Sequence, residues 1–174
     1  MMIGLRCFNI YLLLLIALAV GGGCATGKGK KQYSTLRVFL EVNPDGTDKN
    51  GPVPIFREKP MLVNVQKMPF LTEAQVSRAK VVDVFGGFVL QIEFNQEGTW
   101  LLEQYSASNP GKHFAIQSIF GTKTNFVRWL AAPKITRRIT NGTLTFTPDA
   151  THEEADQIVL GLNNLANEDK KSAK

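Results

Sequence analysis

The chain has 174 residues, a formal net charge of +5 and two cysteines, Cys7 and Cys24. This length allows one domain with a sizeable hydrophobic core. Both cysteines lie near the start, so we expect no disulfide in the rest of the chain and a fold held by its core alone. The lysines gather near the two ends without interleaved aromatics, so nucleic acid is not an expected partner.

The first 24 residues are typical of an exported lipoprotein. An apolar run over residues 10–20 is followed by three glycines and Cys24. The run is shorter than the roughly 20 apolar residues of a membrane-spanning helix and suits the apolar part of a signal peptide. We expect a signal peptide over residues 1–23 and a lipid on Cys24. Gly21 departs from the usual lipobox, which has a branched residue there, so ordinary secretion and an uncleaved anchor stay open.

The chain after the cysteine divides into three parts. Residues 24–34 are rich in Gly and Lys and are interpreted as a tether, which beside a lipid anchor also favours anionic headgroups. Residues 35–167 form one α+β domain, and residues 168–174 are expected to be a charged, disordered tail. The chain is therefore expected in the bacterial cell envelope, membrane-anchored and facing the periplasm or the exterior.

Alternating apolar and polar residues predict the strands. Turn residues at 43–46 are expected to lead into a loop through Pro54, and Gly121 to open a turn between two strands. The predicted strands cover residues 36–42, 62–65, 88–94, 113–120, 126–130 and 143–147.

Three capping signals predict helices. A capping box at residues 72–75 is expected to open a short helix through about Lys80. Asn95 is placed to cap a helix over about 96–105. A second capping box begins at Thr151, and the residues behind it have the spacing of an amphipathic helix.

These elements predict an α+β fold. Strands that alternate, rather than run continuously apolar, indicate a sheet that is covered on one face only. We therefore expect a two-layer, ferredoxin-like sandwich: a mainly antiparallel sheet with helices on one face.

The sequence offers little for catalysis. His113 and His152 each lack a second ligand at metal-binding spacing, and the mature part has no cysteine nucleophile. We expect no catalytic residue, no metal, no cofactor and no small-molecule substrate. A small enzyme stays a minor alternative, which would need a deep pocket lined by convergent acidic or histidine side chains.

One group of side chains has two interpretations. Phe39 falls on the polar face of its strand, and Phe126, Arg128 and Trp129 lie close together in another. A loop or helix end could cover these aromatics. Alternatively, they form a polypeptide-binding surface, because aromatic residues and arginine are enriched in such patches.

From residue 53 onward, the order of short motifs resembles the head subdomain of the first periplasmic domain of SecD, an accessory subunit of the protein-export translocase. The resemblance covers about two-thirds of the chain, and it depends on the shared order more than on any one motif. The matching segments are 53–62 (VPIFREKPML), 71–79 (LTEAQVSRA), 90–98 (LQIEFNQEG), 111–116 (GKHFAI), 132–135 (APKI), 139–142 (ITNG), 146–147 (FT) and 154–155 (EA).

The resemblance implies a ferredoxin-like, non-enzymatic head that holds emerging preprotein, with preprotein or Sec translocase components as partners. The chain departs from SecD in two ways: no segment after the signal could span a bilayer, and residues 121–130 are longer than the family's tight hairpin. We expect a membrane-tethered head that contacts translocating or unfolded polypeptide, through an open strand edge or apolar residues of an uncovered sheet face. The alternative is an envelope lipoprotein that uses the fold for protein–protein interaction without a transport role.

Overall fold

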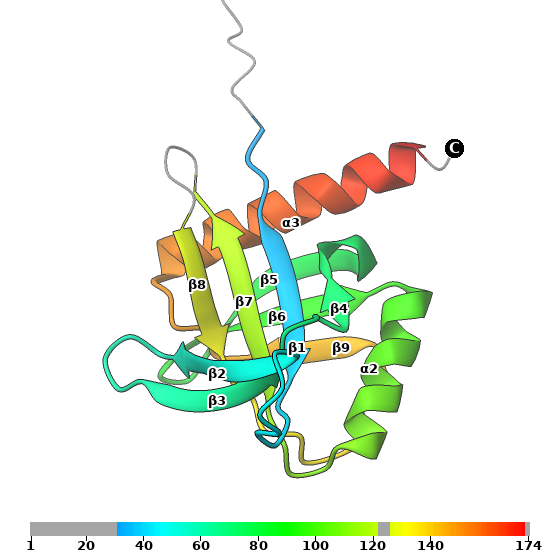
Figure 1. Ribbon diagram of the computed structural model, residues 1–174. Helices are drawn as coiled ribbons and strands as arrows, with labels where there is room; N and C mark the ends of the chain where they lie inside the picture. The colour runs from blue at the N-terminus through cyan, green and yellow to red at the C-terminus, as the bar shows by residue number, and fades with distance from the viewer. Residues whose placement is uncertain (1–30, 122–125, 173–174) are drawn as a thin grey trace, which may run out of the picture. The chain divides into compact units, whose positions relative to one another are not determined.

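The computed structural model describes residues 31–121 and 126–172 (Figure 1). The expected signal peptide and Cys24 lie outside the described residues. The described strands pair antiparallel and form sheets with the orders β4-β1-β7-β8, β2-β3 and β5-β6-β9. The elements are β1 (Thr35–Leu40), β2 (Asn50–Ile55), β3 (Met61–Gln66), β4 (Leu71–Thr72), η1 (Glu73–Gln75), β5 (Val76–Val84), β6 (Gly87–Phe94), α2 (Gln96–Ser108), β7 (Phe114–Phe120), β8 (Phe126–Ala131), β9 (Thr143–Phe146) and α3 (His152–Ser172).

The four-stranded sheet is the middle layer of the domain. In β1, three consecutive residues are buried: Val38, Phe39 and Leu40 are 0%, 6% and 7% exposed. Successive side chains of a strand point to opposite faces, so consecutive burial means that both faces of this sheet are covered.

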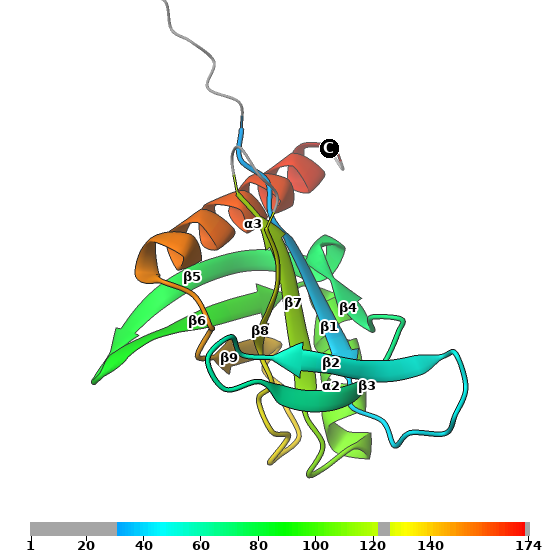
Figure 2. The ribbon, with the colours of Figure 1, turned by 60° about the vertical axis from the view of Figure 1, so that its left-hand side comes forward.

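The main core lies between the four-stranded sheet, the three-stranded sheet and the two α-helices. Val38 of β1 and Ile116 of β7 contribute from the first sheet, Leu90 of β6 from the second, Leu102 from α2 and Ile158 from α3. The strands of the two sheets cross steeply, with β5 and β6 running across β1 and β7 (Figure 2). This arrangement corresponds to the orthogonal class of sheet packing.

The β2–β3 hairpin covers the opposite face of the four-stranded sheet. A second core forms there from Phe39 and Ala115 of the sheet and from Ile55, Val63 and Val65 of the hairpin. The loop expected through Pro54 is wrong over residues 50–54, which belong to β2. Proline is tolerated in β2 because this strand lies at a sheet edge, where a missing N–H is harmless.

The α+β class is therefore confirmed, and the expected two-layer arrangement is corrected. The hairpin adds a third layer, so the middle sheet is covered on both faces rather than one. The structure does not specifically show a ferredoxin-like sandwich, since the two strands that flank α2, β6 and β7, lie in different sheets. No helix within the two described ranges is long and apolar enough to cross a membrane.

The helix expected through Lys80 was wrong. The capping box forms, and Gln75 Oε1 accepts a hydrogen bond from Thr72 N at 3.0 Å, but it serves one 3₁₀ turn only. The chain continues directly into β5, whose valines pair with β6. Pairing of β-branched residues overrides the local helix signal here.

The other two helix starts are confirmed. Asn95 Oδ1 accepts from Gly98 N at 2.9 Å at the start of α2. At the start of α3, Thr151 N donates to Glu154 Oε2 at 2.9 Å, and Glu154 N donates to Thr151 Oγ1 at 3.2 Å. These three bonds satisfy backbone groups at the start of each helix.

Helix α3 continues to Ser172, so the expected disordered tail over 168–174 is helical in its described part. Glu168 accepts from Lys31 Nζ at 2.7 Å and from Tyr33 Oη at 2.9 Å. These contacts lower the pKa of Glu168, and the hydrogen bond from Lys31 has a larger effect than the one from Tyr33. The helix end is therefore attached to the start of the domain.

The segment 31–34, expected as the end of the tether, lies across α3. Asn164 Nδ2 donates to Gln32 O at 2.8 Å, and Ser34 is 1% exposed. Gly161 permits this close approach, because a Cβ at that position would lie 2.3 Å from Ser34 Oγ and 2.5 Å from Ser34 N.

Candidate functional site

Two of the aromatic residues singled out in the sequence are part of the second core. The rings of Phe39 and Trp129 lie 5.1 Å apart, and both pack beneath the β2–β3 hairpin. A polypeptide could reach Phe39 only if the hairpin moved. For this pair, the structure favours the interpretation that other elements cover the aromatics.

Arg128 is engaged in internal contacts. Its side chain is 14% exposed, and its Nη1 lies 2.6 Å from Glu154 Oε2. The guanidinium also lies 5.2 Å from the centre of the Phe120 ring. The Arg128 hydrogen bond lowers the pKa of Glu154. Arg128 therefore connects β8 to the first turn of α3.

Phe126 pairs with Phe120 through the backbone at the start of β8, and its side chain lies outside the described part. Of the residues predicted to contact polypeptide, Phe39, Arg128 and Trp129 are thus not brought together as one exposed patch.

The edges of the sheets differ in how they are covered. Helix α3 covers the free edge of β5 at Ala79, where Asn163 Oδ1 accepts from Ala79 N and Asn163 Nδ2 donates to Ala79 O, both at 2.9 Å. Lys170 Nζ adds a bond to Ser77 O at 3.3 Å. The Asn163 amide acts as a neighbouring strand would, with one donor and one acceptor.

On other edges, single backbone groups have partners or are replaced by proline. Asn64 O of β3 accepts from Val42 N at 2.9 Å. Leu130 O of β8 accepts from Asp149 N at 2.7 Å. In β2, Pro52 and Pro54 have no N–H to offer, which is a common way to protect an edge strand.

The outer edge of β9 remains open. Phe94 N donates to Gly142 O at 2.9 Å, which fixes the register of the β6–β9 pair. Since alternate residues of an antiparallel strand direct their backbone groups to the same neighbour, Leu144 faces β6. The backbone groups of Thr143 and Thr145 therefore face away from the sheet.

One of these outward donors is already satisfied. Thr143 N donates to Asn141 Oδ1 at 3.2 Å. Within the described ranges, the backbone N–H and C=O of Thr145 have no hydrogen-bond partner outside the sheet. The edge therefore offers the Thr143 carbonyl and both backbone groups of Thr145 to another chain.

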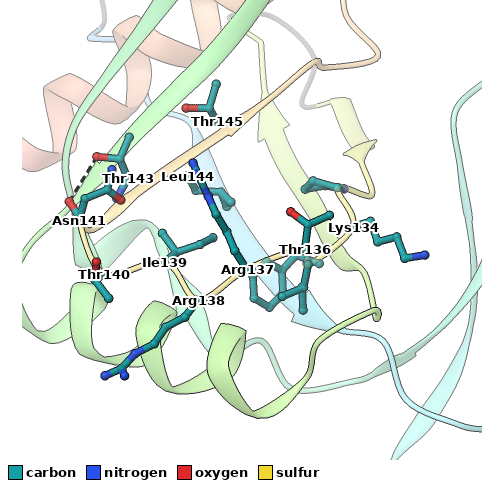
Figure 3. Close-up of a pocket in the computed structure, with 13 residues that line it drawn as sticks. Lys134, Thr136, Arg137, Arg138, Ile139, Thr140, Asn141, Thr143, Leu144 and Thr145 are labelled. Carbon is teal, nitrogen blue, oxygen red and sulfur yellow. Dashed lines mark hydrogen bonds between the residues drawn. The ribbon is translucent and has the colours of Figure 1, made fainter.

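A cavity of about 500 Å³ lies beside this edge (Figure 3). It separates β9 from the loop 133–141. Ile135 N donates to Lys112 O at 2.8 Å and Ile139 N donates to Ser106 Oγ at 2.9 Å, so the loop is fixed on both sides of its middle. The lining residues are Phe114, Pro133, Lys134, Ile135, Thr136, Arg137, Arg138, Ile139, Thr140, Asn141, Thr143, Leu144 and Thr145.

The cavity wall is polar and positively charged. Three of its lining residues are cationic and none is acidic. Arg138 forms an ion pair with Glu103 of α2. In Figure 3 the side chain of Arg137 extends across the cavity toward β9, whereas that of Arg138 points away from it.

The two histidines form pairs rather than a metal site. His113 Nδ1 lies 2.7 Å from Glu41 Oε2. His152 Nε2 lies 3.3 Å from Asp83 Oδ1, and its Nδ1 lies 3.1 Å from Asp156 Oδ2. The pKa of His152 is raised, and the hydrogen bond to Asp83 is the largest cause. Among the described residues, no group of three or more His, Cys, Asp or Glu side chains could hold a metal ion.

Sequence patterns do not predict this edge and cavity. The basic residues Lys134, Arg137 and Arg138 and the threonines of β9 were visible in the sequence, but nothing in it placed them on opposite walls. The open edge depends on where the loop 133–141 is held, which is a tertiary property.

The chain folds as a small α+β module with an open strand edge, and the comparisons identify its family. The model of the SecDF P1 head subdomain matches residues 50–166, which include β2 through most of α3. The chain therefore belongs to the SecDF P1 head family, as the motif order predicted. None of the curated proteins matches.

Solved structures share the fold. A structure of a membrane component SecDF that enhances protein export is 23% identical, with a TM-score of 0.53, over 76% of this chain. A crystal structure of SecDF in a super-membrane-facing form is 24% identical, with a TM-score of 0.52, over 76% of this chain. The matches cover 63% of the first structure's chain and 19% of the second's.

Proposed function

We propose that this chain is a non-enzymatic head module of the protein-export machinery. In this proposal it faces the periplasm or the exterior and holds translocating or unfolded polypeptide as an added strand along β9. The observation that carries the proposal is the unpaired backbone of Thr145 beside a cavity of about 500 Å³. Membership in the SecDF P1 head family supports the link to export.

Strand addition suits a client of variable sequence. Main-chain hydrogen bonds give the affinity, so many side chains are tolerated. The edge offers the Thr143 carbonyl, the Thr145 N–H and the Thr145 carbonyl, and each bond contributes about 0.5–1.5 kcal/mol net. Part of this gain offsets the loss of freedom on binding. We therefore expect dissociation constants that are roughly micromolar or weaker.

Thr145→Pro tests the proposal. Proline removes the outward N–H of Thr145 and adds a ring at the edge, while the Leu144 pairing with β6 does not use that N–H. Binding of an end-blocked, fluorescent, unstructured peptide should weaken at least about fivefold, because one hydrogen bond is lost and the proline ring also obstructs the edge.

The control is Thr145→Ala, which keeps the backbone donor and should bind within about twofold of the wild type. Equal binding by wild type and Thr145→Pro, measured by fluorescence anisotropy, would show that β9 is not the site. Absence of peptide binding to the wild type would reject the function itself.

We also propose that residues 1–23 are a signal peptide and that a lipid on Cys24 attaches the module to the membrane through the tether 24–34. The apolar run and the small residues before Cys24 support this part. Labelled palmitate should enter the wild-type chain and not Cys24→Ala. Equal labelling of the two would reject the anchor.

A further inference from the structure

We infer that the cavity beside β9 favours client segments with an acidic side chain, and that Arg137 receives the carboxylate. This inference rests on the proposed function, because it assumes that an extended chain pairs with β9. It adds a chemical preference to a contact that is otherwise independent of sequence.

Arg137 is the cation in the cavity that is available for a ligand. Arg138 is paired with Glu103, and Lys134 points out of the cavity in Figure 3. Within the described residues, Arg137 has no ion pair or side-chain hydrogen bond, and the cavity lining has no acidic residue. A carboxylate entering the cavity would therefore meet an uncompensated positive charge.

The backbone that carries Arg137 is held before a client arrives, and its side chain is exposed. The backbone on both sides is held, by Ile135 N bound to Lys112 O at 2.8 Å and by Ile139 N bound to Ser106 Oγ at 2.9 Å. The side chain extends across the cavity toward β9. A strand added to β9 projects every second side chain to the same face, so one acidic side chain in the correct register could reach the guanidinium.

The guanidinium suits a carboxylate better than an amide. Its planar fork can donate two parallel hydrogen bonds to the two carboxylate oxygens, and such charge-assisted bonds are stronger than neutral ones. An amide of the same size offers one oxygen and no charge. Glutamate and glutamine in otherwise identical peptides therefore isolate the contribution of Arg137.

The test uses the full chain and two end-blocked peptides that differ only by a central Glu or Gln. Because the ends are blocked, the side chain is the only source of a carboxylate. Wild type should bind the Glu peptide roughly three- to tenfold tighter, as a charge-assisted bond at a partly exposed site implies. Arg137→Gln should bind the two within about twofold of each other. The Glu advantage should also shrink as salt rises.

Lys134→Gln is the matched control, because it removes the same charge from the same cavity rim and should keep the Glu advantage. If wild type binds both peptides equally, the acidic preference is wrong and the proposed function stands. If Arg137→Gln keeps the advantage, the assignment to Arg137 is wrong. If neither peptide binds, both proposals fail. Unfolding curves for each variant show that the fold is intact.

Discussion

The two edge strands of the three-stranded sheet, β5 and β9, both pair with β6. They differ in whether their outward backbone groups have hydrogen-bond partners. Asn163 of α3 satisfies both backbone groups of Ala79 on the outer side of β5. On the outer side of β9, the loop 133–141 is held away by its bonds to Lys112 and Ser106, and the Thr145 backbone stays open. Unpaired edges invite association with other chains. The open Thr145 backbone lies beside a cavity and is therefore a reasonable place to look for function.

The largest effect is expected when the closed edge is opened. Asn163→Ala removes both partners of the Ala79 backbone, and Ala79 is 2% exposed. Leaving a buried donor and acceptor unsatisfied should lower the free energy of unfolding by about 2–4 kcal/mol. Urea unfolding measures this loss.

Asn167→Ala is the control, because Asn167 lies one turn further along α3 and is exposed. Its replacement should leave stability unchanged or raise it by about 0.5 kcal/mol, since alanine is the better helix former. If the two variants lose equal stability, Asn163 does not close the β5 edge.

A smaller effect is expected at the junction of β8 and α3. Glu154→Gln keeps an oxygen for the capping box and removes the charge that pairs with Arg128. The free energy of unfolding at neutral pH should fall by about 1–2 kcal/mol.

The effect of Glu154→Gln should depend on pH. Arg128 holds the pKa of Glu154 below its usual value of 4.5 in the folded state. The stabilisation is therefore complete above the unfolded pKa and is lost as the pH falls through the lower, folded pKa. Unfolding curves of wild type and variant should converge below that usual value. Glu153→Gln removes a charge from the neighbouring residue, which has no ion pair with Arg128, and is the matched control.

The smallest effect is expected at the open edge. Thr145→Pro alters an edge strand at a position whose N–H lies outside the sheet, so its free energy of unfolding should change by less than about 1 kcal/mol. Thermal unfolding followed by circular dichroism measures the change. A loss as large as that of Asn163→Ala would mean that β9 is structurally closed in the same way as β5.

Local patterns predicted much of the fold. The alternation over residues 88–94 and the caps at Asn95 and Thr151 describe interactions between near neighbours, and the structure confirms them. The capping box at Thr72 also forms, so its local sequence signal was as clear as the other two. Pairing of β5 with β6 nevertheless limits the helix to one turn. The loop expected through Pro54 is instead part of β2, because its pairing with β3 cannot be read from that segment alone.

The candidate site could not be predicted in the same way. Phe39 alternates like a solvent-facing residue, and only the β2–β3 hairpin, folded over it from another part of the chain, makes it internal. Arg137 and Thr145 are separated by a turn in the sequence. Their relation becomes visible only in the structure, where they line the same cavity. Such features depend on which edges the fold covers, and long-range packing decides that.

The crossing of segment 31–34 over α3 at Gly161 also bears on mechanical load. Ser34 and Gln32 are held on α3 by close packing and by Asn164, and the chain then enters β1. If the preceding tether is anchored and a client pulls on the module, tension enters through α3 and β1. Helix α3 is the element that closes β5. The proposed client edge at β9 would then lie away from the point where the anchoring force is applied.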